Sequence, residues 1–183
     1  MEIKSFGFSG VPKIIFGAGS FDKIDSLIPA STRKVLVMTG SFPGRMPDQW
    51  DSFIQRLKNQ GVILETAVCN YEPSPELVDE VAFRLRDQEI GLVIAIGGGS
   101  VVDAGKSISA MLTKEGSVAL YLEGRKDRKE HDGRKVPFIA VPTTAGTGSE
   151  ATKNAVLSRI GELGFKKSLR HDNFVPDIAL IDP

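Results

Sequence analysis

Short apolar runs alternate with longer amphipathic stretches along most of this chain. The runs at 34–40, 62–69 and 92–96 are rich in Val, Ile and Leu, which predicts strands of a sheet. The stretches at 47–61 and 74–91 repeat apolar residues every three or four positions, which predicts helices with one face on a core. The order strand, helix, strand, helix, strand is typical of a parallel sheet with helical crossovers.

The second of these helices begins at a clear signal. Ser74 suits the N-cap because its hydroxyl can accept from a free backbone N–H, and Pro75 suits the first helical position. Further strands are predicted at 136–142 and 177–182, and a β segment followed by a short helix near Ser20 at the amino end. The inferred fold class is α/β: a doubly wound, mostly parallel, Rossmann-like sheet that binds its ligand at the carboxyl ends of the strands.

Three consecutive glycines at 97–99 join a strand to the helix predicted after them. A helix amino end carries unpaired N–H groups and a positive dipole, and glycine lets a phosphate approach them. The glycine turn therefore indicates phosphate binding, although a tight packing turn has the same pattern. Ser100 can cap the helix or donate to a phosphate oxygen. The P-loop and full G-x-G-x-x-G patterns are absent from the sequence.

Two charged residues follow in the same predicted helix. Asp103 either favours the helix dipole or bonds a substrate or nicotinamide group, and both interpretations stay open. Lys106, two turns into the helix, either reaches back toward a ligand or lies on the surface.

A second polar loop, PTTAGTGSE at 142–150, follows the strand predicted at 136–142. We call it the threonine loop, because Thr143, Thr144 and Thr147 place hydroxyl groups on it. Its glycines permit unusual backbone angles. Since it also follows a strand, we expect it to face the same ligand as the glycine turn, although both segments can simply be turns.

Composition restricts the partners. Lys plus Arg and Asp plus Glu both number 23, so the formal net charge is zero and neither nucleic acid nor an anionic membrane is expected as a partner. The charged segment at 124–135 is predicted to be a solvated surface loop, with a recognition patch as the alternative. Neither a signal-peptide pattern nor an apolar run of about 18 residues occurs in the sequence, which favours a cytoplasmic protein.

Cys69 is the sole cysteine, which excludes an internal disulfide. It lies among apolar residues, so it is predicted to end a buried strand rather than to act as a nucleophile.

Four segments together resemble the iron-containing, or group III, alcohol dehydrogenase family: FGAGS at 16–20, GGGSVVDAGK at 97–106, PTTAGTGSE at 142–150 and PDIALIDP at 176–183. Their order and spacing cover nearly the whole chain, which is more specific than any one motif. The resemblance implies that 1–183 form the NAD- or NADP-binding domain of a metal-dependent alcohol dehydrogenase. Such an enzyme transfers hydride between an alcohol or aldehyde and the nicotinamide.

The resemblance also implies the cofactor contacts. In that family the glycine pattern holds the pyrophosphate and the threonine loop contacts the nicotinamide end, with Asp103 near the nicotinamide and Lys106 supporting the site. Lys166 matches a family lysine that reaches the ribose region, although the adjacent Lys167 leaves the register open. The contacts implied are Gly98, Gly99, Ser100, Asp103, Thr143, Thr144, Thr147 and Lys166.

The strand at 34–40 departs from the NAD-using members. Those relatives place an aspartate near its end, where a carboxylate bonds the adenosine ribose hydroxyls. Here Gly40 removes that charge, Ser41 can donate to a 2′-phosphate, and Arg45 is near enough in sequence to pair with it. Gly40 and Ser41 are therefore predicted cofactor contacts, and NADP is favoured over NAD.

The resemblance implies that the metal ligands of the family, an aspartate and histidines, lie in an all-helical carboxyl-terminal half, which we expect to fall outside these 183 residues. We therefore predict no catalytic or metal-binding residue here, and iron or another divalent metal only in a full-length protein. The chain itself, whether a piece or a natural truncation, is expected to be inactive. His131 and His171 are flanked by charge and predicted to lie on the surface.

Other interpretations stay open. Glycerol dehydrogenases and dehydroquinate synthases share the glycine pattern, although the threonine loop favours the alcohol dehydrogenases. A non-catalytic nucleotide-binding module is the alternative from another class. The expected partner is a small alcohol or aldehyde in the full-length protein, and apolar surface left by a missing half favours a homodimer.

Overall fold

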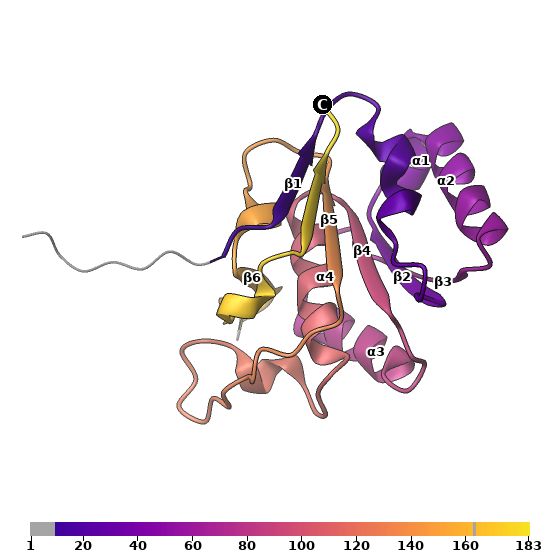
Figure 1. The fold of residues 1–183 in the computed structure, drawn as a ribbon. Helices are drawn as coiled ribbons and strands as arrows, with labels where there is room; N and C mark the ends of the chain where they lie inside the picture. The colour runs from indigo at the N-terminus through magenta and orange to yellow at the C-terminus, as the bar shows by residue number, and fades with distance from the viewer. Residues whose placement is uncertain (1–9, 163) are drawn as a thin grey trace, which may run out of the picture.

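A parallel sheet forms the centre of the molecule. The structure is a computed structural model that describes residues 10–162 and 164–183. Six strands pair in parallel in the order β1-β8-β5-β4-β2-β3 (Figure 1). This arrangement confirms the predicted α/β class. The strands are β1 (Lys13–Phe16), β2 (Lys34–Thr39), β3 (Ile63–Val68), β4 (Leu92–Gly97), β5 (Phe138–Pro142) and β8 (Ile178–Ile181).

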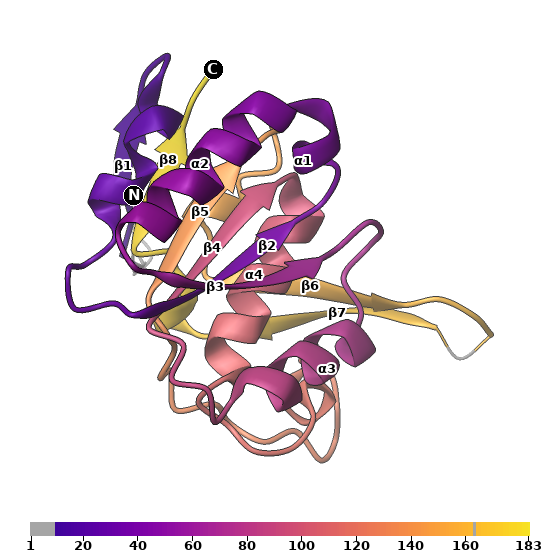
Figure 2. The same cartoon turned by 90° about the vertical axis from the view of Figure 1, so that its right-hand side faces the viewer.

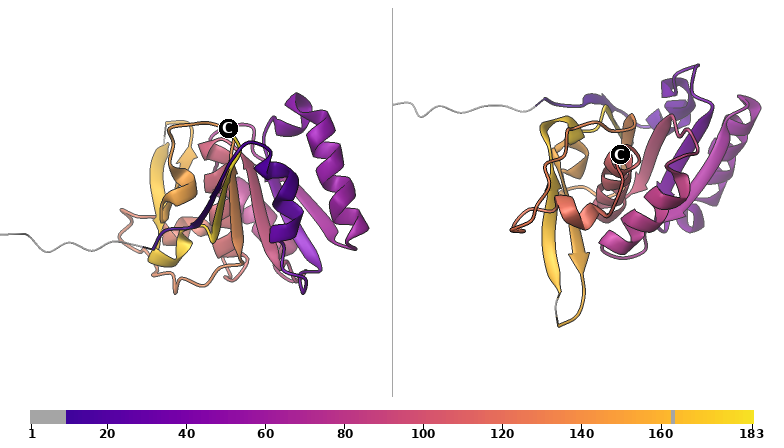
Figure 3. Two further views of the ribbon diagram at one scale, coloured as in Figure 1. Left: turned by 45° about the horizontal axis from the view of Figure 1, so that its top comes forward. Right: turned by 90° about the horizontal axis from the view of Figure 1, so that it is seen from below.

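Helices cover both faces of the sheet, as a doubly wound fold requires. The 3₁₀ helix η1 (Ser20–Leu27), α1 (Phe42–Arg45) and α2 (Pro47–Asn59) lie on one side (Figures 1 and 3). On the other side lie α3 (Pro75–Leu85) and α4 (Gly99–Met111). Each side has its own hydrophobic cluster. The described residues also include short 3₁₀ helices: η2 (Val118–Tyr121), η3 (Ser149–Ala151) and η4 (Asp172–Phe174).

The position of a strand in the sheet decides its burial. All six residues of β4 are buried, because neighbours flank it and helices cover both of its faces. The edge strand β3 instead leaves Ile63 and Val68 about half exposed. Cys69 was expected to end a buried strand, and this expectation is wrong because the strand before it is partly exposed. The Cys69 side chain itself is buried, and burial raises the pKa of its thiol to about 11. That rise disfavours the nucleophilic thiolate.

The predicted helix start at Ser74 is confirmed. Its Oγ accepts from the Leu77 N–H at 3.2 Å, and Pro75 occupies the first helical position of α3. Val78, Val81, Ala82 and Leu85 are buried on the inner face, as the periodicity predicted. Among the helices that the structure describes, none is long and apolar enough to cross a bilayer.

A two-stranded antiparallel hairpin, β6 (Asn154–Arg159) with β7 (Phe165–Arg170), stands apart from the main sheet and was not predicted. Figure 2 shows it beside α4 and running outward from it. Leu157 and Leu169 bury themselves in the same hydrophobic cluster as α3 and α4. The hairpin therefore adds a further layer outside α4.

The connections change direction between β2 and β4. The chain leaves β2 through α2 on one face to reach β3, whereas it leaves β4 through α4 on the other face to reach β5. The loops after these two strands therefore separate and leave a crevice at the carboxyl edge of the sheet, which is where open α/β sheets bind ligands.

Candidate functional site

A cleft lies at this carboxyl edge. Its larger part is a cavity of about 740 Å³ bordered by segments after β2, β5 and β8 and by the start of η1. Some of its lining residues also line a smaller pocket of about 160 Å³ among the ends of β2, β3 and β4. Five predicted site residues line this cleft: Gly40, Ser41, Gly98, Thr143 and Thr144.

Other lining residues were missed by the sequence reasoning. Phe42, Met46 and Gln49 come from the segment after β2, and Asp182 follows β8. Each of these residues follows the carboxyl end of a predicted strand or begins the next helix. The rule that open α/β sheets bind ligands at the carboxyl ends of their strands was therefore a signal that could have found them.

The amino end of α4 borders the cleft. Gly98, not Ser100, is the N-cap, and Ser100 is the second residue of the helix. The alternative in which Ser100 caps the helix is therefore wrong, because the helix begins at Gly99, two residues earlier than that cap would place it. No side chain caps α4, so its first N–H groups keep no partner from the helix or from a capping side chain. These groups form a donor set suited to an anion.

The three glycines of the turn have different surroundings. A β carbon on Gly97 would lie 2.5 Å from Val101 Cγ2, so close packing alone requires glycine there. On Gly98 it would lie 3.4 Å from Thr144 Oγ1, which is ordinary contact. The packing-turn interpretation thus holds for Gly97, whereas Gly98 lies at the cleft.

The threonine loop packs directly on the glycine turn. The Thr143 N–H donates to the Gly97 carbonyl at 2.9 Å. A β carbon on Gly99 would lie 3.0 Å from Thr147 Cγ2. Gly146 and Gly148 have φ angles of 108° and 66°, so the expected unusual backbone angles are present. The two loops lie side by side at one edge of the sheet.

Asp103 bonds to the protein rather than lining the cleft. Its Oδ1 accepts from Ser149 Oγ, and its Oδ2 accepts from the Val156 N–H at 3.0 Å. Burial raises the pKa of this carboxyl, against the lowering effect of the two hydrogen bonds. Asp103 therefore ties α4 to the end of the threonine loop and to β6.

Lys106 is fully buried, so the surface position given as one alternative for it is wrong. Its Nζ donates to the carbonyls of Ser149, Thr152 and Asn154, each at 2.8 Å. The apolar surroundings lower the pKa of the ammonium to about 8, and Asp103 opposes this effect. Its contacts lie at the far end of the threonine loop, at Ser149, and just beyond it, at Thr152 and Asn154.

The other side of the cleft contains the residues considered for the cofactor's adenosine end. A β carbon on Gly40 would lie 3.2 Å from both the Cys69 carbonyl oxygen and Val101 Cγ2. Packing thus favours a glycine at this position independently of any cofactor. Arg45 lines the larger cavity and is exposed. Within 10–162 and 164–183, no carboxylate forms an ion pair with its guanidinium.

Lys166 lies on β7 outside the lining of the cleft. Its Nζ forms an ion pair with Glu72 at 2.8 Å, and both side chains are more than a third exposed. Glu72 belongs to the segment after β3, two residues beyond Asn70, which lines the smaller pocket. The ion pair therefore ties the hairpin to a loop near the cleft.

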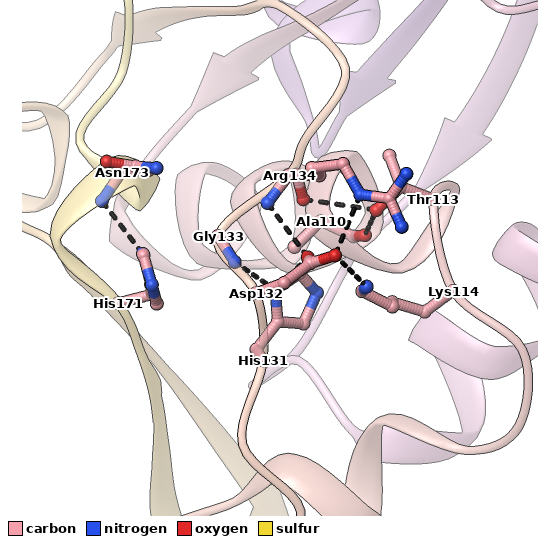
Figure 4. Close-up of polar contacts among 9 residues, drawn as sticks. All are labelled: Ala110, Thr113, Lys114, His131, Asp132, Gly133, Arg134, His171 and Asn173. Atoms are coloured by element: carbon pink, nitrogen blue, oxygen red, sulfur yellow. Dashed lines mark hydrogen bonds and ion pairs between the residues drawn. The ribbon is translucent and has the colours of Figure 1, made fainter.

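His131 does not occupy the surface position predicted for it. His131 is only 6% exposed, and its ring meets Tyr121 and Phe174 edge-on. Its Nδ1 accepts from the Gly133 N–H at 3.0 Å (Figure 4). Burial lowers the pKa of His131 to about 4, so the ring is neutral near pH 7. The charged residues beside His131 in the sequence made a surface position the natural prediction. That prediction fails because their side chains point outward, whereas the imidazole ring packs inward.

His171 is half-buried, and its Nδ1 accepts from the Asn173 N–H at 3.1 Å. The remainder of the 124–135 segment is mostly exposed, as predicted. Among the described residues, no three His, Cys, Asp or Glu side chains form a cluster that could hold a metal ion.

Known proteins are similar to this chain in sequence and in fold. The family model for iron-containing alcohol dehydrogenase matches residues 12–183. NADH-dependent butanol dehydrogenase A of Clostridium acetobutylicum is 29% identical over 185 residues, which cover 98% of this chain and 45% of the relative.

Two solved structures extend this comparison. NADH-dependent butanol dehydrogenase A from Thermotoga maritima superimposes with a TM-score of 0.85 at 27% identity, over 98% of this chain and 44% of that one. Sulfoacetaldehyde reductase from Bifidobacterium kashiwanohense, in complex with NAD⁺, superimposes with a TM-score of 0.79 at 30% identity, over 98% of this chain and 47% of that one. The chain thus spans less than half of the length of these relatives.

Proposed function

Because this chain belongs to the iron-containing alcohol dehydrogenase family, we propose that its cleft binds the nicotinamide cofactor of an enzyme that interconverts an alcohol and an aldehyde. When bound, the cofactor carries the hydride that is exchanged with the substrate carbon. The observation that carries the proposal is the uncapped amino end of α4, which borders the cleft at the switch point of the sheet. There, free N–H groups and the helix dipole suit a pyrophosphate.

Different residues of the chain would contact different parts of the cofactor. Gly98, Gly99 and Ser100 at the start of α4 would donate N–H groups, and the Ser100 hydroxyl, to the pyrophosphate. Thr143 and Thr144 line the adjoining wall, and their hydroxyl groups would orient the nicotinamide half. Thr147 keeps the threonine loop against Gly99. Asp103 and Lys166 contact the protein here, and we propose that they act on the cofactor site through the loops that they hold.

The cofactor preference is a further part of the proposal. The butanol dehydrogenases named above are described as NADH-dependent. In this chain, Arg45 and Ser41 both line the cavity, and the Arg45 guanidinium would pair with the two negative charges that a 2′-phosphate adds. Gly40 supports this choice less strongly, since packing also requires a small residue there. We therefore favour NADP over NAD on the strength of Arg45 and Ser41.

The metal in the family's name does not fit the described residues. His131 Nδ1 and His171 Nδ1 both accept backbone N–H groups, and no third ligand joins them in a cluster. Within the part of the chain that the structure describes, we therefore assign no residue to a metal and no reaction step to one.

Titrating NADH and NADPH into the chain tests the proposal, with the fluorescence of Trp50, the sole tryptophan, as the readout. We expect saturable quenching, with ADP competing because it carries the same pyrophosphate. Absence of saturable binding of either cofactor up to millimolar concentration would refute the proposed site.

A further inference from the structure

Lys106 is a buried cation whose donors are all used. An ammonium group has three N–H donors, and three carbonyl oxygens at 2.8 Å accept from it. No carboxylate among the described residues lies within ion-pair distance of Nζ. The nearby charges are Asp103 and Glu150. Carbonyl dipoles, rather than an ion pair, therefore compensate for burying this charge.

The three acceptors belong to one short segment. Ser149, Thr152 and Asn154 span the turn of η3 and the first residue of β6, outside the main sheet. A carbonyl buried without a partner is destabilising, so a segment whose carbonyls converge inward needs a donor at their meeting point. Lys106 supplies that donor from α4.

These hydrogen bonds fix the position of the carboxyl-terminal end of the threonine loop. At its near end, the Thr143 N–H is bonded to Gly97 at 2.9 Å. At its far end, Ser149 is held twice, through its carbonyl by Lys106 and through its hydroxyl by Asp103. Asp103 and Lys106 are three positions apart on α4 and so lie on the same side of the helix. The intervening glycines would otherwise leave the loop with much conformational freedom.

We propose that Lys106 is a positioning residue that holds the threonine loop against the amino end of α4 through its three carbonyl acceptors. It touches no part of the cleft; its effect on the cofactor is transmitted by the loop between Thr143 and Ser149. The consequence for cofactor affinity rests on the proposed function, whereas the holding of the loop does not.

Amide hydrogen exchange on the cofactor-free chain tests the holding directly. Lys106→Met removes every donor, while Lys106→Gln has a side chain of the same length as methionine and keeps two N–H donors. We expect exchange in peptides from 143–154 to speed up at least tenfold in Lys106→Met, with Lys106→Gln in between. Peptides from β2 and β4 should stay close to wild type.

Leu57→Ala is the matched control for general destabilisation, because Leu57 is fully buried on the opposite face of the sheet. It should speed exchange throughout the fold without singling out 143–154. Wild-type protection of the loop in Lys106→Met would overturn the inference, as would a loss spread evenly over the loop, β2 and β4. Where Lys106→Met does not fold, Lys106→Gln is judged by the same comparison.

A cofactor titration separates this inference from the proposed function. NADPH and NADH should bind at least tenfold more weakly to Lys106→Met than to Leu57→Ala. Unchanged affinity in a variant with a loosened loop would overturn the link between the loop and the cofactor. If the wild-type chain binds neither cofactor, the proposed function fails, while the exchange data still decide whether Lys106 holds the loop.

Discussion

The Thr147 side chain lies directly over Gly99, with its Cγ2 only 3.0 Å from the place where a β carbon on Gly99 would be. The second loop of the cleft therefore covers the first turn of α4. A side chain on Gly99 has to displace the threonine loop or enter the space at the helix end. Both changes act on the proposed pyrophosphate site.

Replacing Gly99 with valine is expected to weaken cofactor binding at least tenfold while the chain stays folded. The branched side chain would push Thr147 aside and obstruct the free N–H groups of α4. Fluorescence titration gives the affinity and circular dichroism the folding. Gly44→Val is the matched control, because a β carbon on Gly44 meets nothing within 4 Å. Equal affinities in the two variants would show that the Gly99 turn is only structural.

Arg45→Gln tests the preference for NADP. Losing the guanidinium should weaken NADPH binding about tenfold, or about 1.4 kcal/mol, and leave NADH binding nearly unchanged. Lys58→Gln, an exposed cation on α2, controls for net charge. The preference is wrong if the wild-type chain binds NADH more tightly than NADPH, or if Arg45→Gln leaves the ratio of the two affinities unchanged.

His131 predicts a loss of stability in mild acid. Its pKa is lowered to about 4 in the folded chain from an ordinary value near 6.5, so between these values the unfolded chain binds the extra proton. Stability is therefore full above pH 6.5 and falls as the pH drops toward 4, by up to about 3 kcal/mol. Urea unfolding at pH 7 and pH 4.5 measures this difference.

His131→Gln should flatten the His131 part of that pH dependence, whatever its effect on stability at pH 7. His171→Gln retains His131 and serves as the comparison variant. A fall in stability that is unchanged in His131→Gln, or that disappears in His171→Gln, would contradict the assignment to His131.

Much of the fold follows from local patterns. The buried strands show themselves as apolar runs because a strand covered on both faces needs no polar positions, as in β4. Ser74 marks its helix start through a contact only three residues away. The two loops of the cleft could be expected to meet because both follow parallel strands.

The remainder depends on contacts that no local pattern encodes. The carbonyl acceptors of Lys106 lie 43 to 48 residues further along the chain, so its burial could not be inferred from its own neighbours. His131 is flanked by charged residues but packs against Tyr121 and Phe174 from other segments. The β6–β7 hairpin pairs with itself outside the main sheet, so the alternation of the parallel sheet does not reveal it.

Chemical-shift mapping during titration with NADPH or NADH tests the central claim, that the dinucleotide binds at the carboxyl edge of the sheet. In the ¹⁵N-labelled chain, we predict that the amides of Gly98, Gly99 and Ser100 move most, followed by those of Thr143 and Thr144. The amides around His131 and His171 should stay in place. Saturable shifts centred on the histidines, or no saturable shifts at all, would contradict the account.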